Sequence, residues 1–276
     1  MITLDVIIIG LLIGSFLNVL IYRIPMVIEW EWRHSSRECL GLPQDLKDLK
    51  PSSFYQGRSF CPHCHHQLSA FQNIPVLSFI FLKGRCQYCK HPISWRYPIV
   101  EVVSAFLFYG CYHYFGLSLG GFLFLTALMC WWVLFWIDAQ TYLLPDEFVY
   151  TSLWVGLLSA ALKTSPLVNA AQAIEGAVIA WLGLWLFAKI YQGIRKKEGM
   201  GHGDFKLLSA LAVWVGPWGI LPIILVATIL GSLWAMFNLI QGQDKNHPIP
   251  FGPFLILAGV LVWVFPHLWQ PYLVLN

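Results

Sequence analysis

Two aspartates lie at the ends of apolar segments in this chain, where carboxylates are rare. Asp138 closes the stretch "LMCWWVLFWID", and Asp204 follows the glycines of "GHGD" at the start of another apolar segment. An ionisable group in such surroundings is costly and is usually retained for function. Two neighbouring carboxylates share one proton, because both cannot ionise cheaply, and such a pair can activate water against a peptide carbonyl. We therefore predict that Asp138 and Asp204 form the catalytic dyad of an aspartic protease.

Simpler explanations exist for acids in these positions. Asp204 could cap a helix, and Asp138 could lie in the layer of lipid headgroups. Asp146 follows Pro145 and precedes Glu147. That pattern is typical of a helix cap followed by an acidic first turn, so we do not expect Asp146 to be catalytic.

The surroundings of Asp204 favour the catalytic interpretation. Gly201 and Gly203 lack Cβ atoms, so the backbone beside Asp204 can approach a bound peptide closely. The start of the following helix and Lys206, two residues on, should stabilise negative charge on Asp204. Asp138 closes a helix, where the dipole and the apolar neighbours disfavour charge. The sequence thus predicts that an ionised Asp204 activates water and that a protonated Asp138 donates to the scissile carbonyl.

A second chemical pattern lies in the large hydrophilic segment. "CPHC" and "CQYC" place two cysteine pairs at the spacing C-x2-C-x21-C-x2-C. This spacing is typical of two knuckles that close one tetrahedral zinc site, and four protein ligands leave no open position for water. Two disulfides or four free thiols are the alternatives. We predict a structural zinc ion whose ligands are Cys61, Cys64, Cys86 and Cys89.

The elements that position these residues are predicted to be membrane-spanning helices. Of the 276 residues, 58% are hydrophobic and only 11% are charged, whereas a soluble domain carries about 25% charged residues. The sixth apolar segment is short, since its residues would extend only about 18 Å as a helix, and it could be a short span, a half-helix or part of a broken pair. We predict an all-α polytopic membrane protein with about eight helices, at 2–24, 97–116, 119–138, 147–163, 169–192, 205–216, 218–240 and 249–266.

The distribution of charge predicts the orientation and the domains. Most of the Lys and Arg residues fall between residues 23 and 96, and a further group lies around 195–206. The positive-inside rule places both regions in the cytoplasm, and eight crossings put them on the same side. We expect a first membrane helix at 1–24, a cytoplasmic zinc-ribbon-like loop at 25–96, and the remaining helices with the aspartates at 97–276. The basic residues are explained by topology and anionic lipids, so no nucleic-acid partner is predicted.

Several ordered blocks resemble one known family. "GHGD" and "IDAQTYLLPD" are similar to the motifs of GxGD aspartic proteases, specifically the type IV prepilin peptidases. "GSFLNVLIYRIP", the cysteine-bearing block at 60–101 and "IPFGPFL" follow the same family's pattern. The resemblance implies an inner-membrane enzyme, with Asp138 and Asp204 at the catalytic positions. It would remove the basic leader of type IV prepilins and of type II secretion pseudopilins, after a glycine and on the cytoplasmic side.

The resemblance also implies a second activity, methylation of the new N-terminal residue with S-adenosylmethionine. The chain has no dinucleotide-binding glycine fingerprint. Because the family associates methylation with the cysteine-bearing loop, Gly84, Arg85 and Glu101 are the candidate cofactor-binding residues. Two other classes are the alternatives: a proton-coupled transporter with a regulatory zinc loop, and a non-catalytic assembly scaffold, which would leave the paired acids unexplained. The sequence indicates neither the individual pilin nor the oligomeric state.

Overall fold

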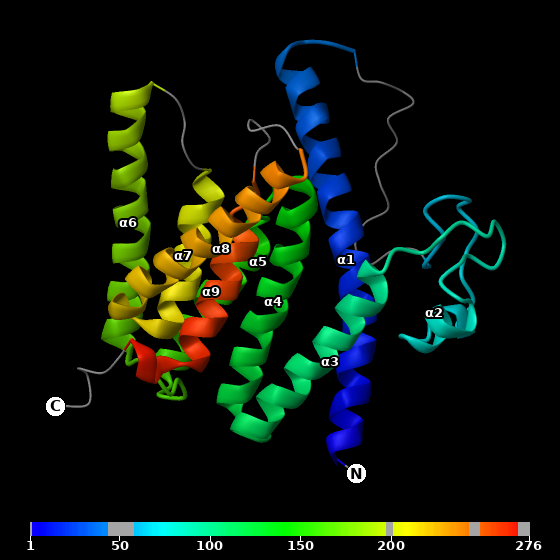
Figure 1. The fold of residues 1–276 in the computed structure, drawn as a ribbon, viewed down its shortest axis with the longest axis horizontal. Coiled ribbons are helices and arrows are strands. Elements are labelled where there is room, and N and C mark those ends of the chain that lie inside the picture. Colours follow the sequence, from blue (N-terminus) through cyan, green and yellow to red (C-terminus); the bar gives the residue numbers. More distant parts are fainter. Residues whose placement is uncertain (1, 44–57, 197–200, 243–248, 270–276) are drawn as a thin grey trace. The chain divides into compact units, whose positions relative to one another are not determined.

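A computed structural model describes residues 2–43, 58–196, 201–242 and 249–269, and helices dominate these ranges (Figure 1). In these ranges each of the eight predicted apolar segments contains or overlaps one helix of 13 or more residues, and a five-residue helix lies in the cysteine-bearing loop. The helices are α1 (Ile2–Cys39), α2 (Leu77–Phe81), α3 (Arg96–Phe115), α4 (Leu119–Thr141), α5 (Asp146–Ala161), α6 (Ala170–Arg195), α7 (His202–Val215), α8 (Ile220–Ile240) and α9 (Gly252–Val264).

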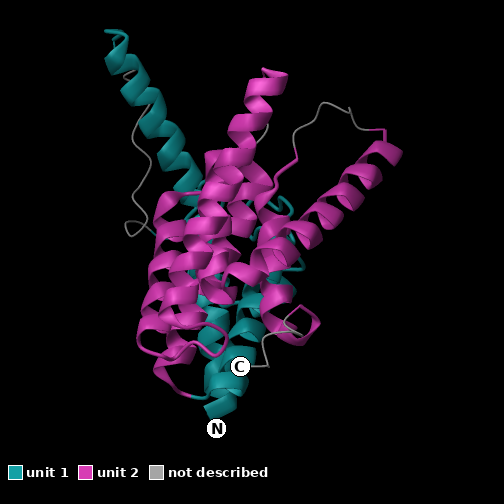
Figure 2. Cartoon of the chain, turned by 90° about the vertical axis from the view of Figure 1, so that its left-hand side faces the viewer, with its two compact units in different colours: residues 1–116 teal, residues 117–276 magenta. Residues whose placement is uncertain are grey.

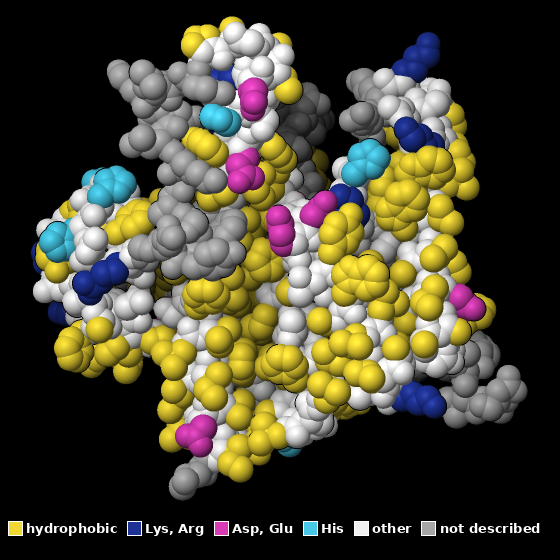
Figure 3. Space-filling view, turned by 180° about the vertical axis from the view of Figure 1, so that it is seen from behind, with side chains coloured by type: hydrophobic (Ala, Val, Ile, Leu, Met, Phe, Trp, Pro, Cys, Tyr) yellow, Lys and Arg dark blue, Asp and Glu magenta, His cyan; other side chains and the backbone are white. Residues whose placement is uncertain are grey.

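The helical membrane character is confirmed, whereas eight crossings are not established. Among the described residues, four helical stretches are long and apolar enough to cross a membrane by length and composition: α1, α4, α6 and Pro217–Ile240, which includes α8. The helices α5, α7 and α9 have 16, 14 and 13 residues. Hydrophobic side chains cover large areas of the face in Figure 3, as expected for a surface in contact with lipid.

The chain forms two compact units, residues 1–116 and 117–276 (Figure 2). The first unit holds α1 to α3 and the four paired cysteines, and the second holds α4 to α9 and both candidate aspartates. Helix α1 continues past residue 24 to Cys39, with Pro25 inside it. No glycine or proline follows Pro25 until Gly41, which has a left-handed backbone (φ +64°). The N–H groups of Gly41 and Leu42 donate to the carbonyls of Glu38 and Arg37, and these C-capping hydrogen bonds end the helix.

Within the first unit, small residues let α1 and α3 approach closely. A Cβ atom on Gly10 would lie 2.6 Å from the Ala105 Cα, and one on Gly14 would lie 2.7 Å from the Glu101 Cα. Glycines spaced in this way are typical of helices that pack at close range in a membrane.

Within the second unit, α7 is the central helix. It packs against α5, α6 and α9, and its residues 207–215 are all buried. At 14 residues it extends only about 21 Å, but a helix surrounded by protein need not match the thickness of the lipid. Gly216 (φ +74°) and a short turn at Pro217–Gly219 separate it from α8. The sixth predicted segment is therefore a short, protein-enclosed helix.

We expect Gly14→Ala to destabilise the first unit, because the added methyl group would meet the backbone of α3 and overpacking costs about 1–3 kcal/mol. Gly110→Ala is the matched control, since a Cβ atom at Gly110 meets nothing within 4 Å. Thermal unfolding in detergent should show a lower midpoint for Gly14→Ala and an unchanged or higher one for Gly110→Ala. Equal midpoints for the two variants would contradict the close packing of α1 on α3.

Candidate functional site

Asp138 lies in the last turn of α4, but its carboxylate is stabilised by another helix. The side chain is buried, at 4% exposure. Its Oδ2 accepts a hydrogen bond from the backbone N–H of Gly252 at 3.0 Å. Gly252 is the first residue of α9, so its N–H has no partner within its own helix. Asp138 therefore acts as a cap for α9, supplied from α4.

Asp204 occupies the third position of α7 and bonds back to the start of that helix. Gly201 is the N-cap residue, and its backbone hydrogen-bonds to the Asp204 carboxylate. This is one half of a capping box. The carboxylates of Asp204 and Asp138 also interact electrostatically. The structure thus brings the two candidate aspartates together, although they are far apart in the sequence.

Two glycines allow the chain to close tightly around the aspartates. A Cβ atom on Gly252 would lie 2.7 Å from the Asp138 Oδ2 and 3.2 Å from Leu144. A Cβ atom on Gly203 would lie 3.1 Å from the same Leu144 side chain. Leu144 therefore contacts the backbone at the start of both α7 and α9. Sequence reasoning assigned no role to Leu144 or Gly252, although each lies within a quoted motif, "IDAQTYLLPD" or "IPFGPFL".

Lys206 does not pair with Asp204. Its Nζ lies 2.9 and 2.8 Å from the two carboxylate oxygens of Asp146, and 5.6 Å from the centre of the Tyr150 ring. Asp146 is the first residue of α5, whose N-cap is Pro145. Asp146 thus lies in the acidic first turn of its helix, where it joins the starts of α5 and α7.

Two of the reasons for predicting an ionised Asp204 do not hold in the structure. Lys206 is engaged by Asp146, and Asp138, despite closing α4, receives the N–H of Gly252 from a helix start. Both carboxylates thus have a backbone donor. Neither acid is therefore singled out as the ionised partner, and close carboxylates hold their protons as a pair. Such a pair can hold a water molecule, remove a proton from it and return a proton to a polarised carbonyl.

The four paired cysteines of the first unit form a compact cluster. One Sγ atom from each residue lies within 4.8 Å of every other, and the sulfurs of Cys61 and Cys89 are 3.9 Å apart. A tetrahedral site with bonds of about 2.3 Å has edges of about 3.8 Å. The cluster therefore has the dimensions of a four-thiolate metal site, and it can bind a metal ion.

The two cysteine pairs have the same local backbone structure. The Cys61 N–H donates to His66 O, and the His65 N–H donates back to Cys61 O. The Cys86 N–H donates to His91 O in the second knuckle, which repeats the pattern. His65 in the first knuckle and Lys90 in the second both have positive φ, 56° and 58°. Each knuckle therefore turns through one left-handed residue.

The two thiols of the second knuckle differ. Against the backbone N–H of His91, burial and the neighbouring thiols raise the pKa of the Cys89 thiol to about 11. The backbone N–H of Cys89, followed by that of Tyr88, lowers the pKa of the Cys86 thiol from 9.0 to about 7. A backbone that points N–H groups at sulfur favours the thiolate form, which is the form that binds metals.

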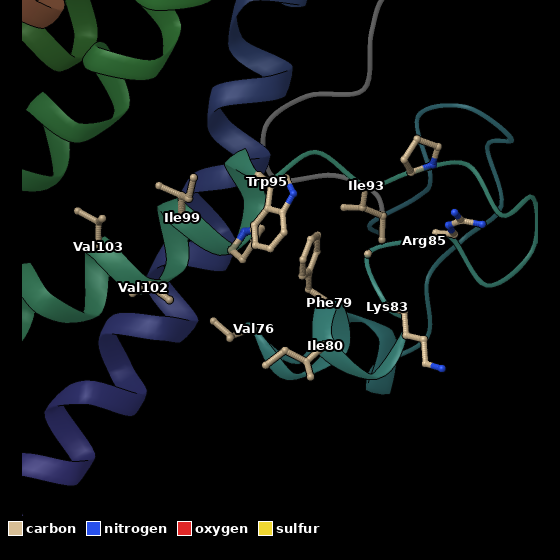
Figure 4. A pocket seen from close by; sticks show the side chains of 13 residues that line it. Val76, Phe79, Ile80, Lys83, Arg85, Ile93, Trp95, Ile99, Val102 and Val103 are labelled. Atoms are coloured by element: carbon tan, nitrogen blue, oxygen red, sulfur yellow. The ribbon is translucent and has the colours of Figure 1, made fainter.

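Two of the three candidate cofactor residues line a cavity of the first unit (Figure 4). Gly84 and Arg85 line this cavity of about 790 Å³, whereas Glu101 is not among its lining residues. Gly84 (φ +66°) lies in the turn after α2, where its N–H donates to the carbonyl of Phe79 and caps the end of the helix. The Glu101 carboxylate accepts a hydrogen bond of 2.7 Å from the Val76 N–H.

Comparison with protein families gives two matches that together cover most of the chain. Residues 8–115 match the family described as "Bacterial Peptidase A24 N-terminal domain", and residues 123–236 match the "Type IV leader peptidase family". The second match includes Asp138 and Asp204, and the first includes the four paired cysteines.

Curated relatives agree with these matches. The chain is 43% identical over 234 residues to a prepilin leader peptidase/N-methyltransferase of Dickeya chrysanthemi, which covers 83% of this chain and 80% of the relative. It is 41% identical over 220 residues to a protein of the same name from Aeromonas hydrophila, with 79% and 74% covered. The corresponding protein of Legionella pneumophila is 39% identical over 229 residues, with 81% and 77% covered. No solved structure matches the chain.

Proposed function

This chain belongs to the type IV leader peptidase family, and we propose that it cleaves the leader from prepilins and then methylates the new N-terminus. The single observation that carries the peptidase activity is the closeness of the two aspartates inside the matched segment. Leu144 contacts both Gly252, which donates to Asp138, and Gly203, which precedes Asp204. The family relationship gives no support to the transporter alternative. The substrates we propose are type IV prepilins and type II secretion pseudopilins.

The proposed mechanism uses only the chain's own groups. The proton shared by Asp138 and Asp204 lets one carboxylate remove a proton from water while the other donates to the carbonyl oxygen of the scissile bond. The Gly252 N–H holds Asp138 in place, and the Gly201 backbone holds Asp204. At Gly203 the Leu144 side chain lies 3.1 Å from the missing Cβ position, so this glycine lets Leu144 pack against the start of α7 beside the dyad.

We place the active site at the cytoplasmic face of the bacterial inner membrane. The support is the excess of Lys and Arg before residue 97 and around 195–206, which the positive-inside rule assigns to the cytoplasm. A substrate whose leader has not been removed presents its basic end on that side.

We propose that zinc occupies the cysteine cluster in a structural role. The support is the chemistry of four thiolates, the separation of the sulfurs and the paired knuckles. Bound metal would join the two knuckles and so order the loop that carries them.

Methylation requires a methyl donor, which we propose to be S-adenosylmethionine. The cavity beside Gly84 and Arg85 provides no anion for the sulfonium and amino groups of this donor, although its cations suit the donor's carboxylate. The cavity is lined by apolar side chains, and its ionisable groups are the cations Lys83 and Arg85. The Glu101 carboxylate is already engaged by Val76. The three candidate residues therefore do not form a site for the sulfonium.

The function is tested by incubating the purified protein with a leader-bearing prepilin, with and without S-adenosylmethionine, and measuring the products by mass. We expect loss of the leader in both reactions and one added methyl group only when the cofactor is present. An intact prepilin in both reactions would overturn the proposed function.

We predict that Asp138→Asn and Asp204→Asn each abolish leader cleavage, because the dyad needs both carboxylates to hold and move the shared proton. Membrane insertion should be unchanged. Asp146→Asn is the control, since Asp146 forms a partly exposed ion pair worth about 1 kcal/mol or less. Near-normal cleavage by either dyad variant would rule out the aspartic mechanism.

We predict that Gly252→Ala reduces the rate of cleavage by roughly 10- to 100-fold, because the added methyl group would displace the Asp138 carboxylate and a shift of about 1 Å can cost that much. Gly183→Ala is the matched control, since a Cβ atom there meets nothing within 4 Å. Initial rates on the same prepilin should separate the two variants. Equal rates would show that Gly252 does not position Asp138.

We predict one zinc ion per chain by elemental analysis of reduced protein that has not been exposed to chelators. Substituting serine for any of Cys61, Cys64, Cys86 or Cys89 should lower the zinc content and increase proteolysis of the loop, because three thiolates bind the metal less tightly. Cys111→Ser is a suitable control, since this cysteine lies outside the cluster. Protein without metal would refute the zinc site and leave the peptidase proposal intact.

A further inference from the structure

Helix α2 presents an apolar face that the known activities do not use. Its residues Leu77, Ile80 and Phe81 are 50%, 61% and 79% exposed. Three large hydrophobic side chains exposed on a helix of five residues are unfavourable in water.

The packing of α3 against α1 gives the depth of the neighbouring residues. Asn18 Nδ2 donates to the Tyr97 carbonyl at 3.1 Å, and the contacts of Gly14 with Glu101 and of Gly10 with Ala105 follow in order. Residues 97–105 of α3 therefore run antiparallel to residues 18–10 of α1. These α1 residues lie in the apolar part of the helix, "VIIIGLLIGSFLNVLIY" at residues 6–22, and α1 is apolar enough to cross the membrane. The first turns of α3 thus lie at the depth of the apolar layer.

Helix α2 lies at the same depth, because it shares a cavity with these turns of α3. Val76, Phe79 and Ile80 form one side of the cavity, and Ile99, Val102 and Val103 of α3 form the other. Figure 4 shows the two sets on facing elements. An apolar face at this depth is adjacent to lipid acyl chains.

The backbone of this segment meets the main requirement for a non-spanning element in lipid, which is that its polar groups find partners inside the protein. Backbone N–H groups of α2 and of the turn after it donate to backbone carbonyls. They include the N–H groups of Leu77, Ser78, Ile80, Leu82, Lys83, Gly84 and Arg85, which donate to backbone carbonyls of the same segment.

The N–H of Val76 has no carbonyl acceptor in that series, and Glu101 accepts it instead at 2.7 Å. Val76 has φ +61°, which is strained for a β-branched residue and has to be held in place. Glu101 also accepts from the Ser15 hydroxyl. A buried acid in an apolar layer is costly without such partners. The acid and the start of α2 therefore satisfy each other.

Cations at the far end of the segment fit a membrane surface. Lys83 and Arg85 follow α2 directly, and in Figure 4 the Lys83 side chain points away from the cavity. Long basic side chains at the end of a membrane-embedded segment extend to anionic headgroups.

We propose that residues 74–84 form a re-entrant element that enters the lipid, with Leu77, Ile80 and Phe81 against acyl chains and Glu101 holding its start through Val76. The element does not cross the membrane. It returns to the surface at Lys83 and Arg85 and so anchors the cysteine-bearing loop to the bilayer.

Photo-crosslinking tests this directly. Benzoylphenylalanine is placed at Phe81, at Phe106 on α3 and at Tyr88 in the second knuckle, positions that are 79%, 68% and 47% exposed. The full-length protein is irradiated in nanodiscs of phosphatidylethanolamine and phosphatidylglycerol, and lipid adducts are measured by mass. Phe81 and Phe106 should give similar adduct yields, each several-fold above that of Tyr88. A Phe81 yield no higher than that of Tyr88 overturns the proposal, as does loss of the Phe81 lipid adduct in favour of a prepilin adduct when prepilin is added.

Two variants test the role of Glu101 in the Phe81-labelled protein. Glu101→Gln keeps an acceptor oxygen for the Val76 N–H and should retain most of the lipid adduct. Glu101→Leu removes the acceptor and should reduce the adduct yield several-fold, while the yield at Phe106 stays unchanged and shows that α3 is still inserted. An undiminished Phe81 yield in Glu101→Leu would overturn the proposal that Glu101 holds the element.

Discussion

A carboxylate inside an apolar helical protein needs a hydrogen-bond donor, and in this chain the start of a helix repeatedly supplies it. The first N–H groups of a helix lack partners within it, so a buried acid and a helix start can satisfy each other. The pairs are Asp138 with Gly252, Asp204 with Gly201 and Glu101 with Val76. Each pair compensates an acid that would otherwise be unstable in its surroundings, and each fixes where a helix begins.

This constraint shapes the residues around the dyad. Because the Gly252 N–H must reach the Asp138 carboxylate, nothing larger than a hydrogen atom fits at the Cα of Gly252 without moving the acid. Leu144 then closes the space between Gly252 and Gly203. The ion pair of Lys206 with Asp146 joins the starts of α7 and α5 at the same end of the unit. The site is thus built from the ends of helices whose middles form the core.

The cysteine cluster follows a more local logic. Each knuckle is closed by hydrogen bonds within six residues, from Cys61 to His66 and from Cys86 to His91. The geometry of each pair of thiols therefore depends little on distant parts of the chain. That is why the spacing of the cysteines predicted the cluster well, although the spacing does not reveal the left-handed residue after each pair.

Local patterns in the sequence determined the helices, the cysteine cluster and the choice of Asp138 and Asp204 as candidate residues. Apolar runs specify helices because buried backbone must be hydrogen-bonded internally, and an acid beside such a run is conspicuous. The environment of each acid was decided by tertiary structure. From its position in the sequence, Asp138 lies at the unfavourable C-terminal end of α4. Gly252, 114 positions away, nevertheless supplies an N–H donor to its carboxylate. Lys206 is two residues from Asp204 in the sequence, but its ammonium group pairs with the carboxylate of Asp146, 60 positions away. A helix end can be recognised from neighbouring residues, but the group that satisfies it depends on which segments pack together.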